Sequence, residues 1–325
     1  VFSWVPDRVR EKILSICETH LSENGVAYIS YNALPGWNMR RSLRDMMLFH
    51  TRSISDPKAK VQQARALLAF LAESVPSENN AYGMLLKNEL SIFGNLADNY
   101  LLHDILGEEN TPFYLQDFLS AAAKHRLQYL GETSIAEMLT SNFPDKVQQT
   151  LSKLNNQLIA QEQYMDFVRN RSFRQTLLVR AGVPVRRNIE PSAMSRFSFR
   201  SSFVRPSGPV ELVPGIPVSF STGGGVQITT ADTFVKALLL ALTETKGVAV
   251  VPYADLLESA RTRSRPFFGE VPSNRDEVDE ATLQINLINL FAKGFVDIYA
   301  EPVAAQTNVP EKPQVYSISR YQALN

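Results

Sequence analysis

The sequence predicts a mainly α, multi-domain protein that is α+β overall. Three observations support this: a single buried strand near the start of the chain, a long helical region after it, and a mixture of strands and helices beyond Gly182. The chain has 325 residues, and single hydrophobic cores stop growing at roughly 250 to 300, so two or three domains are expected. The hydrophobic fraction of 44% and the charged fraction of 20% are typical of a soluble globular protein.

Residues 1–37 have the pattern of one part of an α/β sheet. Pro6 and Asp7 begin a helix with apolar residues along one face, and Gly25 ends it. The next segment, "VAYISY" at 26–31, is almost entirely apolar or aromatic, which is typical of a strand covered on both faces of a parallel sheet. Its parallel neighbours must be reached through crossover helices, and no second strand of this kind follows before Gly182. We therefore interpret this segment as the remnant of a larger, Rossmann-like α/β sheet.

The middle of the chain, residues 38–184, is predicted to be an all-helical domain. One helix begins at Asn38, after a turn at Pro35-Gly36. A second begins at the cap and first-turn proline of "SDPKAKVQQARALLAFLAESV". Further helices are predicted at about 80–106, 113–126, 134–140, 144–154 and 157–181.

The last part of the chain combines strands and helices. Residues 185–230 form a predicted β-rich connector, in which "PVSFST" and "VQITT" make a hairpin around Gly223 to Gly225. In residues 231–325, three amphipathic helices, "ADTFVKALLLALTE", "PYADLLESARTR" and "DEATLQINLINLFAKGF", precede two strand-like segments, "FVDIYAEP" and "QVYSISR". Three helices followed by a two-stranded ribbon predict a winged-helix-like domain.

Composition argues against several classes of protein. Lys+Arg and Asp+Glu both number 33, and this balance disfavours a general nucleic-acid or membrane-surface protein. No apolar run reaches the roughly 20 residues that span a bilayer. The opening "VFSWVPDRVR" lacks the pattern of a signal peptide, so we expect a cytoplasmic protein without a membrane partner. The single cysteine, Cys17, excludes an internal disulfide framework.

No motif for a metal or a nucleotide is found. The four histidines lie far apart without metal-ligand spacing, so no metal site is predicted. His50, His103 and His125 fall in amphipathic helices without a catalytic partner nearby in sequence, and we interpret them as surface or satisfied residues. The glycines of "STGGGVQ" lead into a strand without a Walker lysine. No Gly-x-Gly motif joins a strand to a helix, so this chain lacks the usual loop for S-adenosylmethionine.

The segment "SYNALPGW" is the first candidate binding site. Tyr31, Asn32 and Trp37 follow the carboxyl end of the buried strand, where ligands bind in open α/β sheets. They are therefore candidates to line the substrate side of a site. The alternative is that Asn32 makes a turn and the two aromatic residues fill the junction between domains. Position alone does not decide between these interpretations.

An arginine-rich and phenylalanine-rich stretch, residues 163–205, is the second candidate. It has nine arginines against only Asp166 and Glu190. Arg169, Arg171 and Arg174 could form an interaction patch that grips RNA or an acidic protein. The alternative is that the phenylalanines face a core while the arginines lie in solvent or pair with acids of the helical domain. The zero net charge favours this alternative, so nucleic acid is not the expected partner.

Four blocks of sequence carry a resemblance to a known family: "VFSWVPDRVREKIL", "NGVAYISYNALPGWNMRRSLRDMMLFHT", "NTPFYLQDFLSAAAKHRLQYLGE" and "EQYMDFVRNRSFRQTLL". Together they closely resemble bacterial S-adenosylmethionine-dependent methyltransferases with a methyltransferase regulatory domain, including rickettsial protein lysine methyltransferases that act on outer membrane proteins. That family has an N-terminal class I methyltransferase domain with the cofactor's glycine loop, then a helical regulatory domain and a winged-helix-like domain.

The resemblance implies a regulatory and substrate-positioning role for this chain. On the family's map "VFSW" follows the fourth strand of the class I sheet and "VAYISYN" is the fifth, so most of the N-terminal methyltransferase domain is expected to be missing. We expect S-adenosylmethionine to bind the parent protein and not to bind this chain tightly by itself, which would leave the isolated chain inactive. The expected partners are a protein substrate, the missing N-terminal domain and a second copy of the chain. The alternative function is an RNA- or protein-binding adaptor that uses residues 163–205 and the winged helix.

Overall fold

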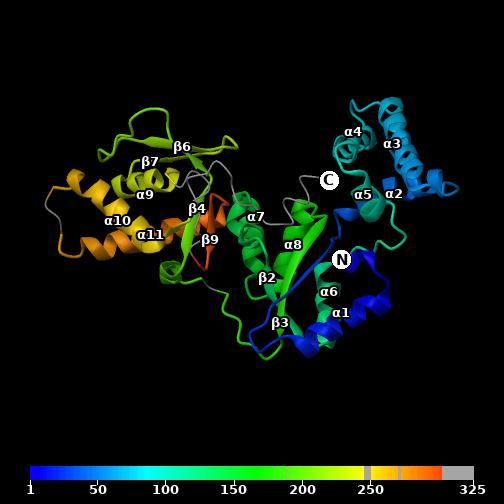
Figure 1. The fold of residues 1–325 in the computed structure, drawn as a ribbon, viewed down its shortest axis with the longest axis horizontal. Coiled ribbons are helices and arrows are strands. Elements are labelled where there is room, and N and C mark those ends of the chain that lie inside the picture. Colours follow the sequence, from blue (N-terminus) through cyan, green and yellow to red (C-terminus); the bar gives the residue numbers. More distant parts are fainter. Residues whose placement is uncertain (188, 245–249, 270–271, 302–325) are drawn as a thin grey trace, which may run out of the picture. The chain divides into compact units, whose positions relative to one another are not determined.

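The computed structural model describes residues 1–187, 189–244, 250–269 and 272–301. The chain divides into two compact units, residues 1–185 and 186–325, each with its own hydrophobic core (Figure 1). Both units combine helices with small antiparallel sheets, so the α+β prediction is confirmed.

The first unit contains a three-stranded sheet in the order β1-β3-β2. Strand β1 (Ala27–Asn32) pairs with β3 (Phe173–Arg180), and β3 pairs with β2 (Leu127–Glu132). Both pairings are antiparallel, with Ala27 opposite Leu178 and Asn32 opposite Phe173 at the two ends of β1. The prediction that β1 lies between parallel neighbours is therefore wrong for its pairing with β3.

The prediction of an all-helical region over residues 38–184 is also wrong, since β2 and β3 both lie within it. The helix predicted at 157–181 ends early: α8 spans Leu158–Arg169, and Asn170 has the left-handed conformation that stops a helix (φ 50°). After this turn, "FRQTLLVR" alternates between exposed and buried residues over most of its length, as a half-covered strand does.

Side chains from three helices cover one face of this sheet. Helix α1 (Asp7–His20), α6 (Leu115–Lys124) and α8 pack on the face that carries Ile29, Tyr31 and Arg174. Neighbouring residues of a strand point to opposite faces, so Tyr28 and Phe173 lie on the other one. Their side chains are 53% and 39% exposed, so this second face is partly open to solvent.

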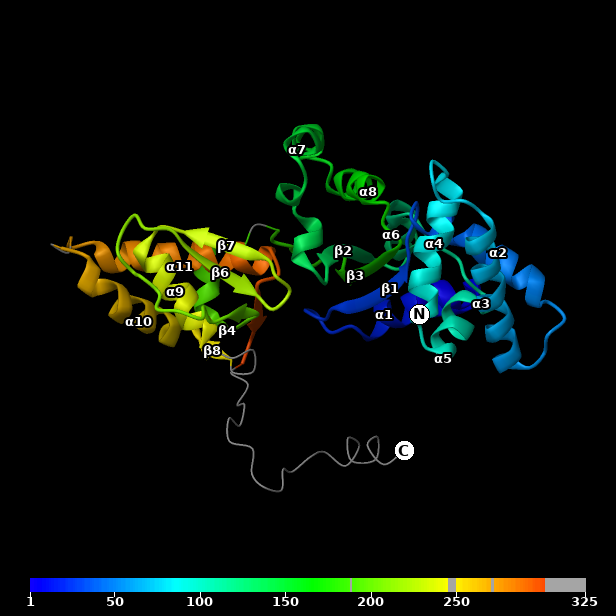
Figure 2. The ribbon, with the colours of Figure 1, turned by 90° about the horizontal axis from the view of Figure 1, so that it is seen from above.

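A helical layer follows β1 in the chain. It consists of α2 (Trp37–Thr51), α3 (Pro57–Ser74), α4 (Ala81–Gly94) and the short α5 (Asp98–Tyr100), which continues into a π-helical turn, Leu101–Ile105. Figures 1 and 2 show these helices gathered at one end of the unit. The start predicted for α3 is confirmed: Asp56 Oδ2 accepts from Ala59 N–H at 2.8 Å, with Pro57 in the first turn.

The remaining elements of the first unit are short. They are the 3-10 helices Phe2–Trp4, Ile135–Met138, Thr140–Asn142 and Ser152–Leu154, and the helix α7 (Asp145–Leu151).

The second unit packs helices α9 (Thr233–Thr243), α10 (Tyr253–Ser264) and α11 (Arg275–Ala292) around one core. Its 3-10 helices are Pro191–Arg196 and Arg265–Phe267, and its strands are β4 (Ser198–Ser201), β5 (Phe203–Val204), β6 (Val218–Thr222), β7 (Gln227–Thr230), β8 (Val251–Pro252) and β9 (Val296–Tyr299). The sheets have the orders β8-β4-β9 and β5-β6-β7. The predicted hairpin is confirmed as β6 and β7, with Phe220 opposite Ile228.

The winged-helix prediction concerns the end of this unit. The three predicted helices are found, and β9 pairs with β4. The second ribbon strand, "QVYSISR" at 314–320, lies outside the described residues. The winged-helix fold therefore stays a prediction.

Candidate functional site

The end of β1 is a junction between three chain segments. Asn32, its last residue, is buried, and its backbone N–H donates to Ser3 Oγ at 2.8 Å while its carbonyl accepts from Phe113 N–H at 2.9 Å. Its side-chain Nδ2 donates to Asn110 Oδ1 at 2.9 Å, and Asn110 Nδ2 donates to the Asp104 carbonyl at 2.7 Å. Asn32 thus holds the first residues of the chain and the segment before α6 together at the end of the sheet.

A cavity lies beside this junction. It has a volume of about 440 Å³ and is lined by Trp4, Leu102, His103, Gly107, Glu108 and Glu109. Trp4 Nε1 donates to the Asp104 carbonyl at 3.2 Å, and the Trp4 ring centroid lies 6.2 Å from that of His103. His103 Nδ1 lies 2.9 Å from Asp104 Oδ1. His103 also lines a neighbouring cavity of about 540 Å³, together with Asp104, so the His103 side chain is shared by both cavities.

The surroundings of these cavities are acidic. Residues 98–109 contain four acids and no lysine or arginine. Asp98 pairs with Arg65 at 2.7 Å, and the other three are Asp104, Glu108 and Glu109. Arg44 Nη2 reaches in from α2 and donates to the carbonyls of Gly107 at 2.5 Å and Glu108 at 3.2 Å, which fixes the loop. The aromatic ring of Trp4 and the nearby carboxylates suit a cationic amine, because a cation is attracted both to an indole face and to negative charge.

Tyr31 and Trp37, which were predicted to line the substrate side with Asn32, are core residues. Tyr31 is fully buried, its ring stacks on Phe118 with centroids 4.2 Å apart, and burial raises the pKa of its hydroxyl. It points to the face of the sheet that the helices cover, because its backbone pairs opposite Arg174 on that face. Trp37 is 4% exposed and packs in the core of α2, α3 and α4. The alternative interpretation, aromatic residues that fill an interior, describes both side chains.

The loop between Asn32 and Trp37 is held against the turn before β3. Ala33 N–H donates to the Ser172 carbonyl at 2.9 Å, and Gly36 N–H donates to the Arg171 carbonyl at 2.9 Å. A Cβ atom on Gly36 would lie 2.2 Å from the Asn170 carbonyl oxygen, so no larger residue fits without moving the turn. The turn therefore sets where the loop lies and where α2 begins.

A buried ion cluster fixes that turn. Arg174 is fully buried: its Nη1 lies 2.6 Å from Glu132 Oε1 of β2, its Nη2 lies 3.1 Å from Glu162 Oε2 of α8, and its Nε lies 2.8 Å from Asp166 Oδ2 of α8. Arg171 Nη2 lies 3.1 Å from Glu132 Oε2 and also pairs with Glu137. Two guanidinium groups thus meet four carboxylates. Burial raises the pKa of Glu162 and of Asp166, against the lowering effect of Arg174.

The predicted interaction patch is not a surface. Arg174 is 0% and Arg171 is 9% exposed, because both neutralise buried carboxylates. Arg169 donates to the Glu137 carbonyl and lies over the Phe143 ring, with 4.2 Å between Cζ and the ring centroid. Arg171 and Arg174 thus pair with acids of the same unit, as the alternative interpretation had it.

The sequence interpretation missed Trp4, His103 and Asp104. The sequence did contain a sign of the His103–Asp104 pair, since the two residues are adjacent in the chain. Trp4 offered none, because its contact with Asp104 joins residues 100 positions apart.

Two further findings concern metals and membranes. Within the described residues, no group of three or more His, Cys, Asp or Glu side chains is placed to hold a metal ion. In the same part of the chain, no helix combines the length and the apolar character that crossing a bilayer requires.

Comparison with known proteins adds to this geometry. A family model described as "Predicted methyltransferase regulatory domain" matches residues 97–180. The structure of PKMT2 from Rickettsia typhi in complex with AdoHcy matches 100% of this chain and 62% of its own, with a TM-score of 0.85 and 34% sequence identity. A second structure of PKMT2 from the same organism matches with a TM-score of 0.84, and that match covers 61% of the PKMT2 chain. These findings support a methyltransferase-related protein.

Two curated proteins also match this chain in sequence. "Uncharacterized protein RP789" of Rickettsia prowazekii is 34% identical over 330 residues, which cover 99% of this chain and 58% of that protein. "Uncharacterized protein RP028" of the same organism is 41% identical over 130 residues, which cover 40% of this chain and 52% of that protein. The chain spans less than two thirds of either relative. Because the PKMT2 match covers this whole chain, it does not by itself show that an N-terminal domain is missing.

The contact at Gly36 gives a first prediction. We expect Gly36→Ala to lower the free energy of unfolding by about 1–3 kcal/mol, as overpacking does, and to change Trp37 fluorescence. Gly94→Ala is the control, because Gly94 ends α4 with nothing within 4 Å of an added Cβ. Urea denaturation followed by tryptophan emission is the measurement, since both tryptophans, Trp4 and Trp37, lie in residues 1–185. Equal stability of the two variants would show that the close contact between Gly36 and the turn at Asn170 does not constrain residue 36.

The ion cluster gives a second prediction. Arg174→Met leaves three buried carboxylates without this partner and should cost about 3–5 kcal/mol, the usual effect of removing one member of a buried pair. Arg41→Met removes an exposed pair with Asp45 and should cost about 0–1 kcal/mol. The same denaturation assay compares them. If Arg174→Met lowered the free energy of unfolding by less than Arg41→Met does, the ion cluster would not hold the unit together.

The third prediction concerns pH. The folded pKa of Glu162 is raised, so its contribution to stability is complete below the unfolded pKa and is lost as pH rises through the folded value. Glu162→Gln has no carboxylate to ionise. The stability of the variant relative to the native protein should therefore increase between about pH 4 and pH 7. Exposed Glu73→Gln should show no such trend, and parallel pH profiles for Glu162→Gln and the native protein would refute the prediction.

Proposed function

We propose that this chain is the regulatory and substrate-positioning portion of an S-adenosylmethionine-dependent protein methyltransferase, with a lysine amine as the acceptor. The observation that carries the proposal is the match of the whole chain to PKMT2, whose structure contains AdoHcy. The acidic cavity beside Trp4 and His103 supports an amine as the group that this chain receives.

The residues of the cavity supply binding and proton transfer in this proposal. The acceptor ammonium lies against the Trp4 indole and is attracted by Glu108 and Glu109, which raises its local concentration. It must lose a proton before its nitrogen can act as a nucleophile. With Nδ1–H donating to Asp104, His103 Nε2 keeps a lone pair that accepts this proton.

The cofactor is assigned to the parent protein and not to this chain. Within the described residues, no Gly-x-Gly sequence joins a strand to the N-terminus of a helix, so the usual cradle for the cofactor is not formed by these residues. We therefore derive no methyl-transfer step from the residues of this chain.

The open edge of β1 supports a role as part of a larger sheet. The N–H and C=O groups of Asn32 bond to Ser3 and Phe113 rather than to β3. Alternate residues of a strand share this orientation, so the backbone of Ser30 and Tyr28 also faces away from β3. No strand among the described residues pairs with that edge, where the Ser30 carbonyl accepts only from the Val1 ammonium at 3.4 Å. A strand of the parent protein that pairs there would also cover Tyr28.

The proposal predicts a defect in the use of the acceptor. In the full-length protein, Trp4→Ala and His103→Ala should each lower kcat/KM for a lysine-containing protein at least about tenfold, with KM for the cofactor unchanged. Transfer of a radiolabelled methyl group from S-adenosylmethionine measures both constants. His50→Ala, an exposed histidine of α2, is the matched control. Unchanged kcat/KM in both variants would refute this site, and transfer to a substrate without lysines would refute the acceptor.

A further inference from the structure

A slot in the second unit lies beside strand β6 and has no part in the proposed function. It has a volume of about 610 Å³. One wall consists of β6 and the two residues before it, and the other consists of residues 205–211, which follow β5. The two strands pair only as far as Val204, which lies opposite Ser221. The slot is therefore the space left where the chain after β5 separates from β6.

The backbone of Ser219 in β6 faces this slot. Thr222 N–H donates to the Val226 carbonyl at 2.9 Å, in the register that pairs β6 with β7, so the backbone groups of Thr222 point towards β7. Successive residues of a strand alternate in this direction, which turns Phe220 towards β7 and Ser219 towards the slot. Within the described residues, nothing pairs with the N–H or the carbonyl of Ser219. Ser219 thus presents one donor and one acceptor at an open sheet edge.

A proline keeps this edge open. Since Val204 lies opposite Ser221, the residue that would face Ser219 in the same register is Pro206. A proline has no N–H, so it cannot donate to the Ser219 carbonyl, and β5 ends two residues before it. Pro209 in the same wall lacks a backbone donor as well. This wall therefore does not complete the ladder that β5 begins.

Lys236 of α9 fixes the chain that leads into β6. It is fully buried, and its Nζ donates to the carbonyls of Val213 at 2.6 Å and Ile216 at 3.0 Å. These bonds tie the turn before β6 to the core of the unit. Val210 and Val218, one from each wall, pack against the same core, so the slot also has an apolar side. The slot is thus a formed hollow with a polar edge and an apolar side.

We propose that the slot binds an extended, uncharged segment of a partner protein, which adds to β6 as an antiparallel strand. The first residue of this segment lies opposite Ser219, donates its N–H to the Ser219 carbonyl and accepts from the Ser219 N–H. The second residue is apolar and contacts Val210 and Val218. The third donates to the Pro217 carbonyl, which the alternation of the strand also directs into the slot.

The charges of the slot fit a neutral segment. Arg205 and Glu211 both line it and are exposed, and neither has an ion pair in the part of the chain that the structure describes. They supply one charge of each sign, so a charged segment is attracted by one and opposed by the other. The slot belongs to the second unit, and its proposed role does not depend on the methyltransferase function.

A pair of isosteric peptides tests the proposed register. The probe is acetyl-Thr-Ala-Val-Ala-Thr-amide, whose valine takes the apolar position. An ester in place of the amide before the first alanine removes the N–H that donates to the Ser219 carbonyl, whereas an ester before the valine removes an N–H that points away from β6. The ester before alanine should bind about tenfold more weakly than the ester before valine.

Nuclear magnetic resonance of the native chain with isotope-labelled serine measures both affinities. The backbone amide signal of Ser219 is assigned by its loss in Ser219→Ala and is followed as each peptide is added. Three results would overturn the proposal. They are no shift of this signal at high millimolar peptide, equal binding of the two esters, and a shift that depends on protein concentration alone, which would assign the edge to a second copy of the chain.

Two proline variants provide a matched comparison on the protein side. Ser219→Pro removes the N–H that faces the slot. Thr229→Pro removes one at the outer edge of β7, because Thr229 lies opposite Ser219 and its backbone points away from β6. Saturation transfer from the protein to the valine methyl groups of the probe should fall in Ser219→Pro and persist in Thr229→Pro, and an equal fall in both would contradict the assigned edge. The ester comparison uses the native chain, so it decides the matter if a proline variant fails to fold.

Discussion

The guanidinium of Arg174 is the contact on which the first unit depends. It joins β2 and α8 to β3 through Glu132, Glu162 and Asp166, and all of these groups are removed from water. Desolvation offsets much of the attraction between buried charges, so such a cluster contributes specificity of arrangement more than net stability. What it specifies is the end of α8. The turn that follows provides the carbonyls of Arg171 and Ser172 to the loop that begins α2. Charge buried under the sheet thereby sets the position of the candidate site at its edge.

The sequence predicted those elements whose signals are local. The start of the first helix at Asp7, the strand "VAYISY", the cap at Asp56 and the β6–β7 hairpin each depend on neighbouring residues, and each was located correctly. The predicted end of the first helix at Gly25 was wrong, because α1 stops at His20 and Leu21 is already extended. The strand β3 was not located. Residues 158–169 have helical spacing, and only the left-handed conformation of Asn170 separates them from the alternation that follows. An asparagine is compatible with a helix and with a left-handed turn, so local sequence did not decide where α8 stops.

The candidate site shows the same division. The position of Asn32 at the end of β1 followed from the strand pattern, and its junction with Ser3 and Phe113 lies there. Which side chains face a cavity did not follow, because Tyr31 and Trp37 are as compatible with a core as with a binding surface. Trp4 meets Asp104 across 100 residues of chain. Whether the arginines face solvent or a buried partner was also undecided from the sequence. The acids that pair with Arg174 come from β2 and α8, and β2 was not predicted.

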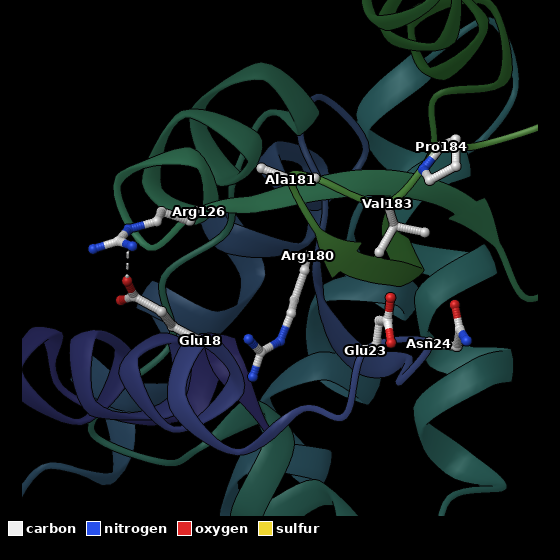
Figure 3. A pocket seen from close by; sticks show the side chains of 9 residues that line it. Glu18, Glu23, Asn24, Arg126, Arg180, Ala181, Val183 and Pro184 are labelled. Atoms are coloured by element: carbon white, nitrogen blue, oxygen red, sulfur yellow. Dashed lines mark ion pairs between the residues drawn. The ribbon is translucent and has the colours of Figure 1, made fainter.

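Strand β3 connects the two ends of the sheet. Phe173 at its start lies 6.4 Å from the Trp4 ring, between centroids. Arg180 at its end lines a second pocket of this unit, of about 410 Å³, and extends there towards α1 (Figure 3). Eight extended residues separate the two regions by roughly 23 Å. Energetic coupling between such regions requires an element with two arrangements that both regions can bias. Arg174 lies between them on this strand and is held by three carboxylates from two other elements, which favours one arrangement. The strand is thus suited to fix the spacing of the two regions. Helix α1 also lies along the sheet between them, since Glu18 lines the second pocket and Leu14 belongs to the same core as Ile29 and Tyr31 of β1.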